Sequence, residues 1–218
     1  MQGERLVQAT VSNNQEQPSS SGPGSAMDGE RSSLYTLLAA LLAAEPTHDV
    51  LRTAAGIEAA DTKLGNTLNE LAGLAANADP EALRDEYFQL FVGVGRGLLV
   101  PYGSYYQTGF LNEKPLARLR ADMARLGIER DPDVKEPEDH IATVFEIMAG
   151  LLSGVFEAGD QVSQEVEAHR FFEAHIAPWA TVFFNDLAET NVSPLYCAVG
   201  RVGYAFIDIE QKAFDYAA

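Results

Sequence analysis

The sequence contains a single cysteine, Cys197, and few positive charges. One cysteine excludes a disulfide within the chain, which is compatible with a reducing compartment. The 15 Lys and Arg residues stand against 32 Asp and Glu residues, so the formal net charge is −17. This balance argues against general nucleic-acid binding, which needs a basic surface. Cys197 lies among apolar residues, and we expect a buried, unreactive thiol there.

The chain also lacks long apolar runs and alternating apolar and polar residues. No uncharged stretch approaches the roughly 18 residues that a membrane span requires. The first residues lack the basic and apolar regions of a secretory signal. We therefore expect a cytoplasmic protein with no stable membrane insertion. The absence of alternating segments joined by hairpin turns argues against a β fold.

Apolar residues instead recur at helical spacing from Ser32 onward. Leucines between residues 34 and 42 form one stripe, with Ser32 or Ser33 as the expected N-cap. Further stripes follow, and Asp79 and Gly127 have the positions of a helix start and a helix end. The sequence predicts an all-α, single-domain bundle of roughly eight to ten helices over residues 31–218. Residues 1–30 are polar, so we predict a flexible tail there.

The segment Glu136-Pro137-Glu138-Asp139-His140 places three carboxylates beside one imidazole, directly before an apolar run. Proline is favoured at the first helical position, and acidic residues in the first turn interact favourably with the helix dipole. The pattern therefore predicts a helix that begins at Pro137 and continues to about residue 157. A simple helix start explains the cluster, and capture of a basic peptide or of a metal ion is the functional alternative.

The remaining motifs give weaker functional signals. Gly93, Gly95 and Gly97 follow a helical pattern rather than a strand, so a flexible loop is favoured over a nucleotide-binding turn. The four histidines do not have the spacing of metal ligands, and no residue pattern requires a cofactor. Ser104 lacks the surroundings of a nucleophile elbow and is expected to be a helix N-cap. We do not expect an enzyme.

Four segments occur in a specific order and spacing: Glu86-Tyr87-x-x-Leu90-Phe91-x-Gly93, Pro101-Tyr102-Gly103-Ser104-x-Tyr106, Glu136-Pro137-Glu138-Asp139-His140-Ile141-Ala142 and Phe172-x-x-His175-x-x-Pro178-Trp179. Together they resemble the redox-enzyme maturation chaperones of the TorD/DmsD/NarJ type. The resemblance covers about residues 33–216 and implies a TorD-like helical bundle that binds proteins rather than catalyses a reaction.

The resemblance further implies a client-specific chaperone for the apo form of a molybdenum-containing oxidoreductase. Members of this family bind the catalytic subunit, often through its twin-arginine leader, while the molybdopterin cofactor is inserted, and they delay export. Two of the four segments, at residues 101–106 and 136–142, are the hallmark segments of this family. They imply a peptide-binding site formed by Glu136, Pro137, Glu138, Asp139, His140, Tyr102, Ser104 and Tyr106. Shorter phrases at residues 115–119 and 145–151 resemble members associated with formate dehydrogenase.

The chemistry of these residues agrees with a peptide site. Carboxylates match the guanidinium groups of a leader, and tyrosines offer a large contact area with a polar end. Two alternatives are an assembly scaffold that recognises a mature subunit surface without the leader, and a nucleotide-dependent switch at the glycine loop. Both a monomer and a helix-swapped dimer are compatible with the sequence.

Overall fold

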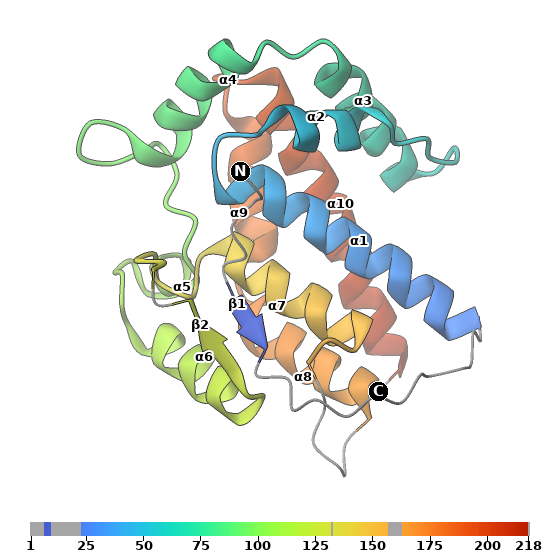
Figure 1. The fold of residues 1–218 in the computed structure, drawn as a ribbon, viewed down its shortest axis with the longest axis vertical. Coiled ribbons are helices and arrows are strands. Elements are labelled where there is room, and N and C mark those ends of the chain that lie inside the picture. The colour runs from blue at the N-terminus through green and yellow to red at the C-terminus, as the bar shows by residue number, and fades with distance from the viewer. Residues whose placement is uncertain (1–6, 10–22, 132, 157–162, 218) are drawn as a thin grey trace.

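The computed structural model describes residues 7–9, 23–131, 133–156 and 163–217. Almost all of the regular secondary structure in the described part of the chain is helical (Figure 1). Its elements are β1 (Val7–Ala9), α1 (Pro23–Ala43), α2 (His48–Ala55), α3 (Lys63–Ala76), α4 (Pro80–Tyr87), the π-helix η1 (Phe88–Val92), α5 (Gly103–Thr108), α6 (Lys114–Arg125), β2 (Ile128–Arg130), α7 (Ile141–Ser153), α8 (Gln164–His175), α9 (Ala180–Glu189) and α10 (Pro194–Ala217). The all-α prediction is therefore confirmed.

Two pairs of helices form the centre of the bundle. α1 packs along α7, and α9 packs along α10, which also covers α3 (Figure 1). Their shared core is aromatic: the ring of Tyr35 on α1 lies 4.9 Å from that of Phe145 and 4.7 Å from that of Phe206. Nearly every residue of α7 is buried, which explains why the apolar run after residue 140 is so dense.

A buried ionic cluster joins the first helix, α1, to the last helix, α10. The Tyr35 hydroxyl donates a hydrogen bond to the Glu210 carboxylate at 3.0 Å, and Arg31 pairs with the same carboxylate at 2.8 Å. Burial, followed by the Glu210 charge, raises the pKa of Tyr35 well above its usual range. A buried carboxylate needs such partners, because an unpaired charge is costly to desolvate. The cluster therefore fixes α10 against α1.

Several local predictions are confirmed. Asp79 caps α4, since its side chain accepts a hydrogen bond from the Glu81 amide at 3.0 Å. Gly127 has the predicted position of a helix end, since it follows α6 and Leu126 with a φ of 66°. Among the described helices, none combines the length and the apolar character that crossing a membrane requires.

Two predicted helix starts are wrong. α1 begins at Pro23 rather than at Ser32, and Ser32 instead donates a hydrogen bond to the Ala149 carbonyl of α7 at 2.9 Å. The helix expected from Pro137 begins at Ile141 and ends at Ser153. Residues 137–140 form a turn, in which the His140 amide donates to the Pro137 carbonyl at 3.2 Å. The sequence also predicts a helix start at Gly159 and Asp160, which lie outside the described residues.

The structure also contains a short sheet that the sequence pattern did not indicate. β1 pairs antiparallel with β2, with Val7 opposite Arg130 and Ala9 opposite Ile128. Three residues are too few for a recognisable alternation. The described parts of residues 1–30 are this strand and the first turns of α1, and the tail boundary at residue 30 stays a prediction.

Candidate functional site

The structure brings the two hallmark segments together as one hydrogen-bonded unit. Tyr102 and His140 form an antiparallel bridge. The Ile141 amide donates to the Pro101 carbonyl at 2.9 Å, and the Gly103 amide donates to the Asp139 carbonyl at 2.9 Å. The starts of α5 and α7 are therefore held side by side, although they are far apart in the sequence.

Asp139 caps α5 from this neighbouring segment. Its Oδ2 atom accepts a hydrogen bond from the Ser104 amide at 2.6 Å, and the residue is only 3% exposed. A carboxylate at this position satisfies an amide that has no partner within the helix. The prediction that Ser104 is the N-cap is wrong, because Ser104 lies inside α5 with a buried Oγ atom that has no partner among the described residues.

His140 is the N-cap of α7, whereas the predicted start at Pro137 would place it inside the helix. Its Nδ1 atom accepts a hydrogen bond from the Ala142 amide at 3.2 Å, which requires a neutral ring. Burial lowers the pKa of His140 to about 4. The ring stands edge-on to that of Tyr102, with centroids 5.2 Å apart. His140 therefore stays uncharged at neutral pH.

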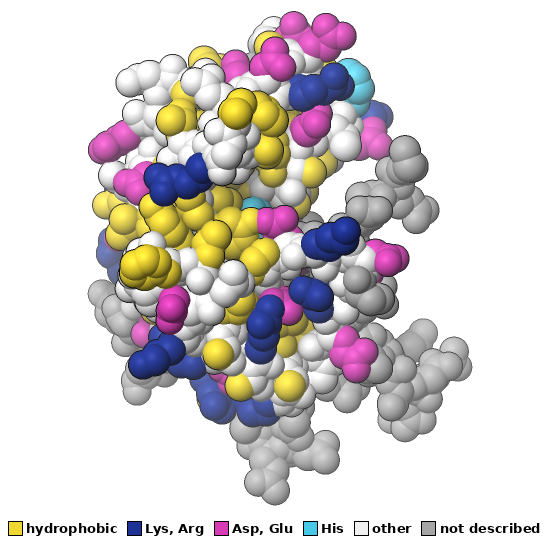
Figure 2. Space-filling model, turned by 90° about the vertical axis from the view of Figure 1, so that its left-hand side faces the viewer, with side chains coloured by type: hydrophobic (Ala, Val, Ile, Leu, Met, Phe, Trp, Pro, Cys, Tyr) yellow, Lys and Arg dark blue, Asp and Glu magenta, His cyan; other side chains and the backbone are white. Residues whose placement is uncertain are grey.

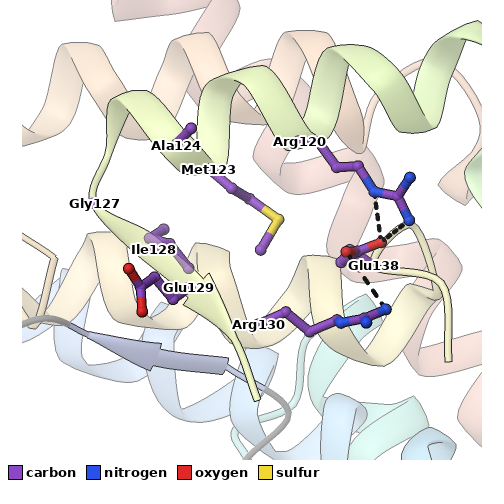
Figure 3. Close-up of a pocket in the computed structure, with 8 residues that line it drawn as sticks. All are labelled: Arg120, Met123, Ala124, Gly127, Ile128, Glu129, Arg130 and Glu138. Atoms are coloured by element: carbon purple, nitrogen blue, oxygen red, sulfur yellow. Dashed lines mark hydrogen bonds and ion pairs between the residues drawn. The ribbon is translucent and has the colours of Figure 1, made fainter. Parts of the chain in front are cut away.

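Glu138 is buried and already paired with two arginines of this chain (Figure 3). Its Oε2 atom accepts hydrogen bonds from the Nε and Nη2 atoms of Arg120 at 3.0 and 2.8 Å. Arg130 approaches Oε1 with Nη1 at 3.7 Å. Burial alone raises the pKa of the Glu138 carboxyl, but the hydrogen bonds from Arg120 hold it below its usual range. This carboxylate therefore already has guanidinium partners.

The other hallmark residues border a surface groove. One hollow of about 400 Å³ is lined by Tyr102, Glu136 and His140 together with Tyr87 and Phe91. A second hollow of about 410 Å³ shares Tyr87 with the first and extends to Phe88. We call the two together the acidic groove, because among the described residues the carboxylates that line it outnumber its two cations, Arg84 and Lys135: they are Glu45, Asp85, Asp131, Asp133 and Glu136.

The groove lies on a face with much exposed apolar surface. The side of the molecule in Figure 2 carries hydrophobic side chains across its middle, with charged side chains around them. Phe88 is 46% exposed and Val92 is 50% exposed. Contiguous apolar surface of this kind is typical of protein interaction sites. The face therefore offers an apolar floor beside the carboxylates.

Glu136 gives the groove its electrostatic preference. It is exposed at the rim, and no described residue forms an ion pair with it. Partial desolvation raises the pKa of its carboxyl, and burial together with the Glu136 charge raises the pKa of Tyr87 to about 12. A carboxylate that is desolvated without a basic partner gains most from a cation. The groove therefore favours a positively charged ligand.

Tyr106 and Pro137 do not line this groove. The Tyr106 hydroxyl donates a hydrogen bond to Asp186 of α9 at 3.0 Å, and its ring lies 5.6 Å from that of Trp179. Tyr106 therefore anchors α5 on α9. Pro137 is half-buried in the turn before α7. Of the eight predicted site residues, the structure gathers Tyr102, Glu136 and His140 in the groove.

Sequence reasoning did not assign Phe88 and Val92 to the site. They lie on η1, whose widened turn closes with a hydrogen bond from the Gly93 amide to the Phe88 carbonyl at 2.7 Å. Gly93 has a φ of 61°, which favours glycine. π-helical turns are frequent at functional sites. The segment from Glu86 to Gly93 is one of the four that carry the family resemblance, so the sequence did contain a signal that η1 belongs to the site.

The glycine loop folds back on η1 instead of forming an open cradle. The Leu98 amide donates to the Gln89 carbonyl at 3.2 Å, and the Leu99 amide donates to the Leu90 carbonyl at 2.9 Å. A phosphate-binding loop presents its amides to the ligand. Because these two amides are already used, the loop lends no support to a nucleotide site.

Comparisons with known proteins agree with this architecture. A family model described as the nitrate reductase delta subunit matches residues 57–185. The chaperone protein TorD of Vibrio cholerae serotype O1 is 28% identical over 137 residues, which are 61% of this chain and 62% of that protein. The chain thus matches less than two thirds of that relative's length. The chaperone protein TorD of Vibrio atlanticus is 25% identical over 207 residues, 86% of this chain and 95% of that protein.

A solved structure shows the same fold. It is a redox enzyme maturation protein from Archaeoglobus fulgidus, with a TM-score of 0.58 and 22% sequence identity. The superposition covers 89% of this chain and 99% of that protein. The family model matches more than half of the residues. The chain therefore belongs to the nitrate reductase delta subunit family of TorD/NarJ-type redox-enzyme maturation chaperones, and both of these relatives are named as chaperones.

Proposed function

We propose that this protein is a client-specific cytoplasmic chaperone that binds the apo form of a molybdenum-containing oxidoreductase through its twin-arginine leader. By holding the leader it assists cofactor insertion into the catalytic subunit and delays export. The observation that carries this proposal is the acidic groove, in which an apolar floor meets five carboxylates and, among the described residues, only two cations, Lys135 and the Arg84 that pairs with Glu45. A leader combines two arginines with an apolar stretch, so its chemistry complements both parts.

The arginines of the leader would bind at the end of the groove that lies near the turn at residues 137–140. Asp133 and Glu136 offer carboxylates that match a guanidinium fork. Tyr87 and Tyr102 offer rings on which a guanidinium group stacks favourably. The apolar stretch would then lie over Phe88 and Val92. This assignment gives each part of the leader a partner of matching chemistry.

The more deeply buried hallmark residues would position this groove rather than touch the leader. Asp139 holds the start of α5, and His140 holds the start of α7. Glu138 holds the turn to α6 through Arg120. In this proposal Glu138, Asp139 and His140 therefore hold Tyr102 and Glu136 in place at the edge of the groove.

Calorimetric titration with twin-arginine leader peptides tests the proposal. The panel includes a formate dehydrogenase leader, because short segments of this chain resemble members associated with that enzyme. The control peptides carry lysine in place of both arginines. Lysine keeps the charge but cannot form a bidentate fork with a carboxylate, so we expect saturable binding that weakens strongly with the control.

Failure of every leader to bind would contradict the proposal. Binding of a leaderless catalytic subunit as tight as that of the full-length subunit would favour the alternative, a scaffold that recognises a mature subunit surface. The two titrations together separate leader recognition from general client binding.

A further inference from the structure

A small cavity lies at the start of α5, where three of the four segments that carry the family resemblance meet. Residues of α5, α6, α7 and α8 line it, and Gly103, Asp139, His175 and Trp179 are among them. We call it the α5 cavity. The segment Phe172–Trp179 does not line the acidic groove, so its place in the molecule needs another explanation.

Asp139 brings an unused hydrogen-bond acceptor to this cavity. Its Oδ2 atom accepts from the Ser104 amide at 2.6 Å, whereas its Oδ1 atom has no hydrogen-bond partner among the described residues. The residue is 3% exposed, so bulk solvent does not supply a donor. A buried carboxylate oxygen without a donor is costly. A donor bound inside the cavity would remove this cost.

The size of the α5 cavity selects the donor. The cavity leaves about 10 Å³ for the centre of a water-sized sphere, which is roughly the room that one water molecule requires. A small organic ligand needs a far larger pocket. Asp139 is the only carboxylate among the described residues that line the cavity, whereas a calcium or magnesium ion takes about six oxygen ligands. A single water molecule is therefore the ligand that fits.

Two further polar side chains line the α5 cavity, Gln107 and His175. The Nε2 atom of His175 lies 2.9 Å from an oxygen of Asp122 and donates to it, because a carboxylate accepts. Burial lowers the pKa of His175, so the ring is neutral at neutral pH and Nδ1 is its acceptor. The Gln107 amide is a donor. Buried water typically makes about three hydrogen bonds, and these three side chains match that number.

We propose that the α5 cavity binds one ordered water molecule, which donates a hydrogen bond to Asp139 Oδ1 and links it to Gln107 and His175. The water then completes the hydrogen bonding of the carboxylate that caps α5. It also connects this cap to α8, on which His175 lies.

The same segment supports α5 by direct packing. The Trp179 indole donates a hydrogen bond to the His175 carbonyl at 2.7 Å, which fixes the ring. A Cβ atom at Gly103 would lie 3.0 Å from the Trp179 Nε1 atom, so the close approach of the indole favours glycine there. In this proposal the segment Phe172–Trp179 positions α5 through the indole and the bound water.

A high-resolution crystal structure of the full chain tests the proposal directly. We expect a water peak within about 3.2 Å of Asp139 Oδ1 and within the same distance of the Gln107 amide or the His175 ring. An empty cavity would overturn the proposal. A direct hydrogen bond from the Ser104 hydroxyl to Oδ1 without a water peak would also overturn it, because the hydroxyl would then be the missing donor.

NMR cross-relaxation between water and backbone amides gives an independent measurement in solution. We expect a direct signal from water to the Ser104 amide, which binds the other oxygen of Asp139. Ser104→Ala removes the serine hydroxyl as a relay by proton exchange, and the signal should persist in this variant. Absence of the signal in the parent protein, or its loss in Ser104→Ala, would overturn the proposal.

A matched pair of valine variants locates the water. Val144→Ile adds a methylene group to a residue that lines the α5 cavity, so it should displace the water and abolish the signal. Val199→Ile makes the same change at an equally buried position of α10 outside the cavity and should keep the signal. A signal that persists in Val144→Ile would overturn the assignment to this cavity. The crystal structure decides if that variant does not fold. These measurements use no leader peptide, so their outcome is separate from that of the proposed function.

Discussion

The carboxylate of Asp139 accepts a hydrogen bond from the Ser104 amide at 2.6 Å, across two segments that the chain separates by 35 residues. This contact links the two hallmark motifs and explains why they occur together. The Asp139 backbone carbonyl adds a second bond to the Gly103 amide at 2.9 Å. A single residue thus fixes the start of α5 relative to the turn before α7.

We predict that Asp139→Ala lowers the free energy of unfolding by about 2 kcal/mol, because it leaves the start of α5 uncapped in a buried position. Chemical denaturation measures the change. Glu58→Ala, which removes an exposed carboxylate, is the control and should change stability by less than about 0.5 kcal/mol. Equal stability of the two variants would contradict this structural role of Asp139.

The buried, neutral His140 predicts a specific pH dependence. Its pKa is about 4 in the folded protein against an ordinary 6.5. Between these values the unfolded chain binds one proton more, so acidification favours unfolding. The stability present above pH 6.5 should fall by about 3 kcal/mol as the pH reaches about 4.

His140→Asn isolates this effect, because asparagine keeps a cap acceptor but does not titrate. Urea denaturation of both proteins from pH 7.5 to 4.5 gives the difference at each pH. The parent protein should lose stability more steeply than the variant on acidification. Parallel curves would show that His140 does not carry this dependence.

The helices were largely predictable, because their signals are local. Apolar spacing identified the buried stripes, with Leu83 and Leu90 inside, and Asp79 acted as the cap that its sequence position indicated. The start of α7 was not predictable in this way. Pro137 has the sequence position of a first helical residue, but the chain turns there and His140 becomes the cap.

The details of the site depend on contacts that spacing does not report. The Asp139 cap comes from a distant segment, and the pairing of Glu138 with Arg120 joins the turn to another helix. The sequence identified the carboxylates but did not show which were already paired. Phe88 lines the groove because η1 is a π-helical turn, which changes the direction in which the side chains of this segment point.

The ion pair of Glu138 predicts unequal effects of two arginine substitutions on α6. Arg120→Ala leaves the buried Glu138 carboxylate with only the more distant Arg130, so we expect a loss of about 1–2 kcal/mol in the free energy of unfolding. The half-exposed position of Arg120 limits the loss. Urea denaturation measures it, with Arg118→Ala as the control that should stay near zero. Similar losses in both would contradict a structural role for the Glu138 pair.

The exposed apolar floor of the groove predicts a loss of binding without a loss of stability. Phe88→Ser removes a side chain that is 46% exposed in the free protein and that a bound leader would cover. We expect leader affinity to fall about tenfold, while the melting temperature changes little. Val182→Ser changes an apolar residue of α9 that is 56% exposed and should leave affinity unaltered. Equal affinity of the Phe88 variant and the parent would remove η1 from the binding surface.

The central claim is that carboxylates at the rim of the acidic groove bind the leader arginines, while Glu138 stays paired within the protein. The most direct measurement is the leader affinity of the double variant Asp133→Asn/Glu136→Gln, determined by calorimetry. Glu58→Gln/Glu189→Gln, which removes the same charge at exposed positions outside the groove, is the control. We predict at least a roughly tenfold loss in the rim variant and none in the control. Parent-like affinity in the rim variant, together with a loss in Glu138→Gln, would contradict the account.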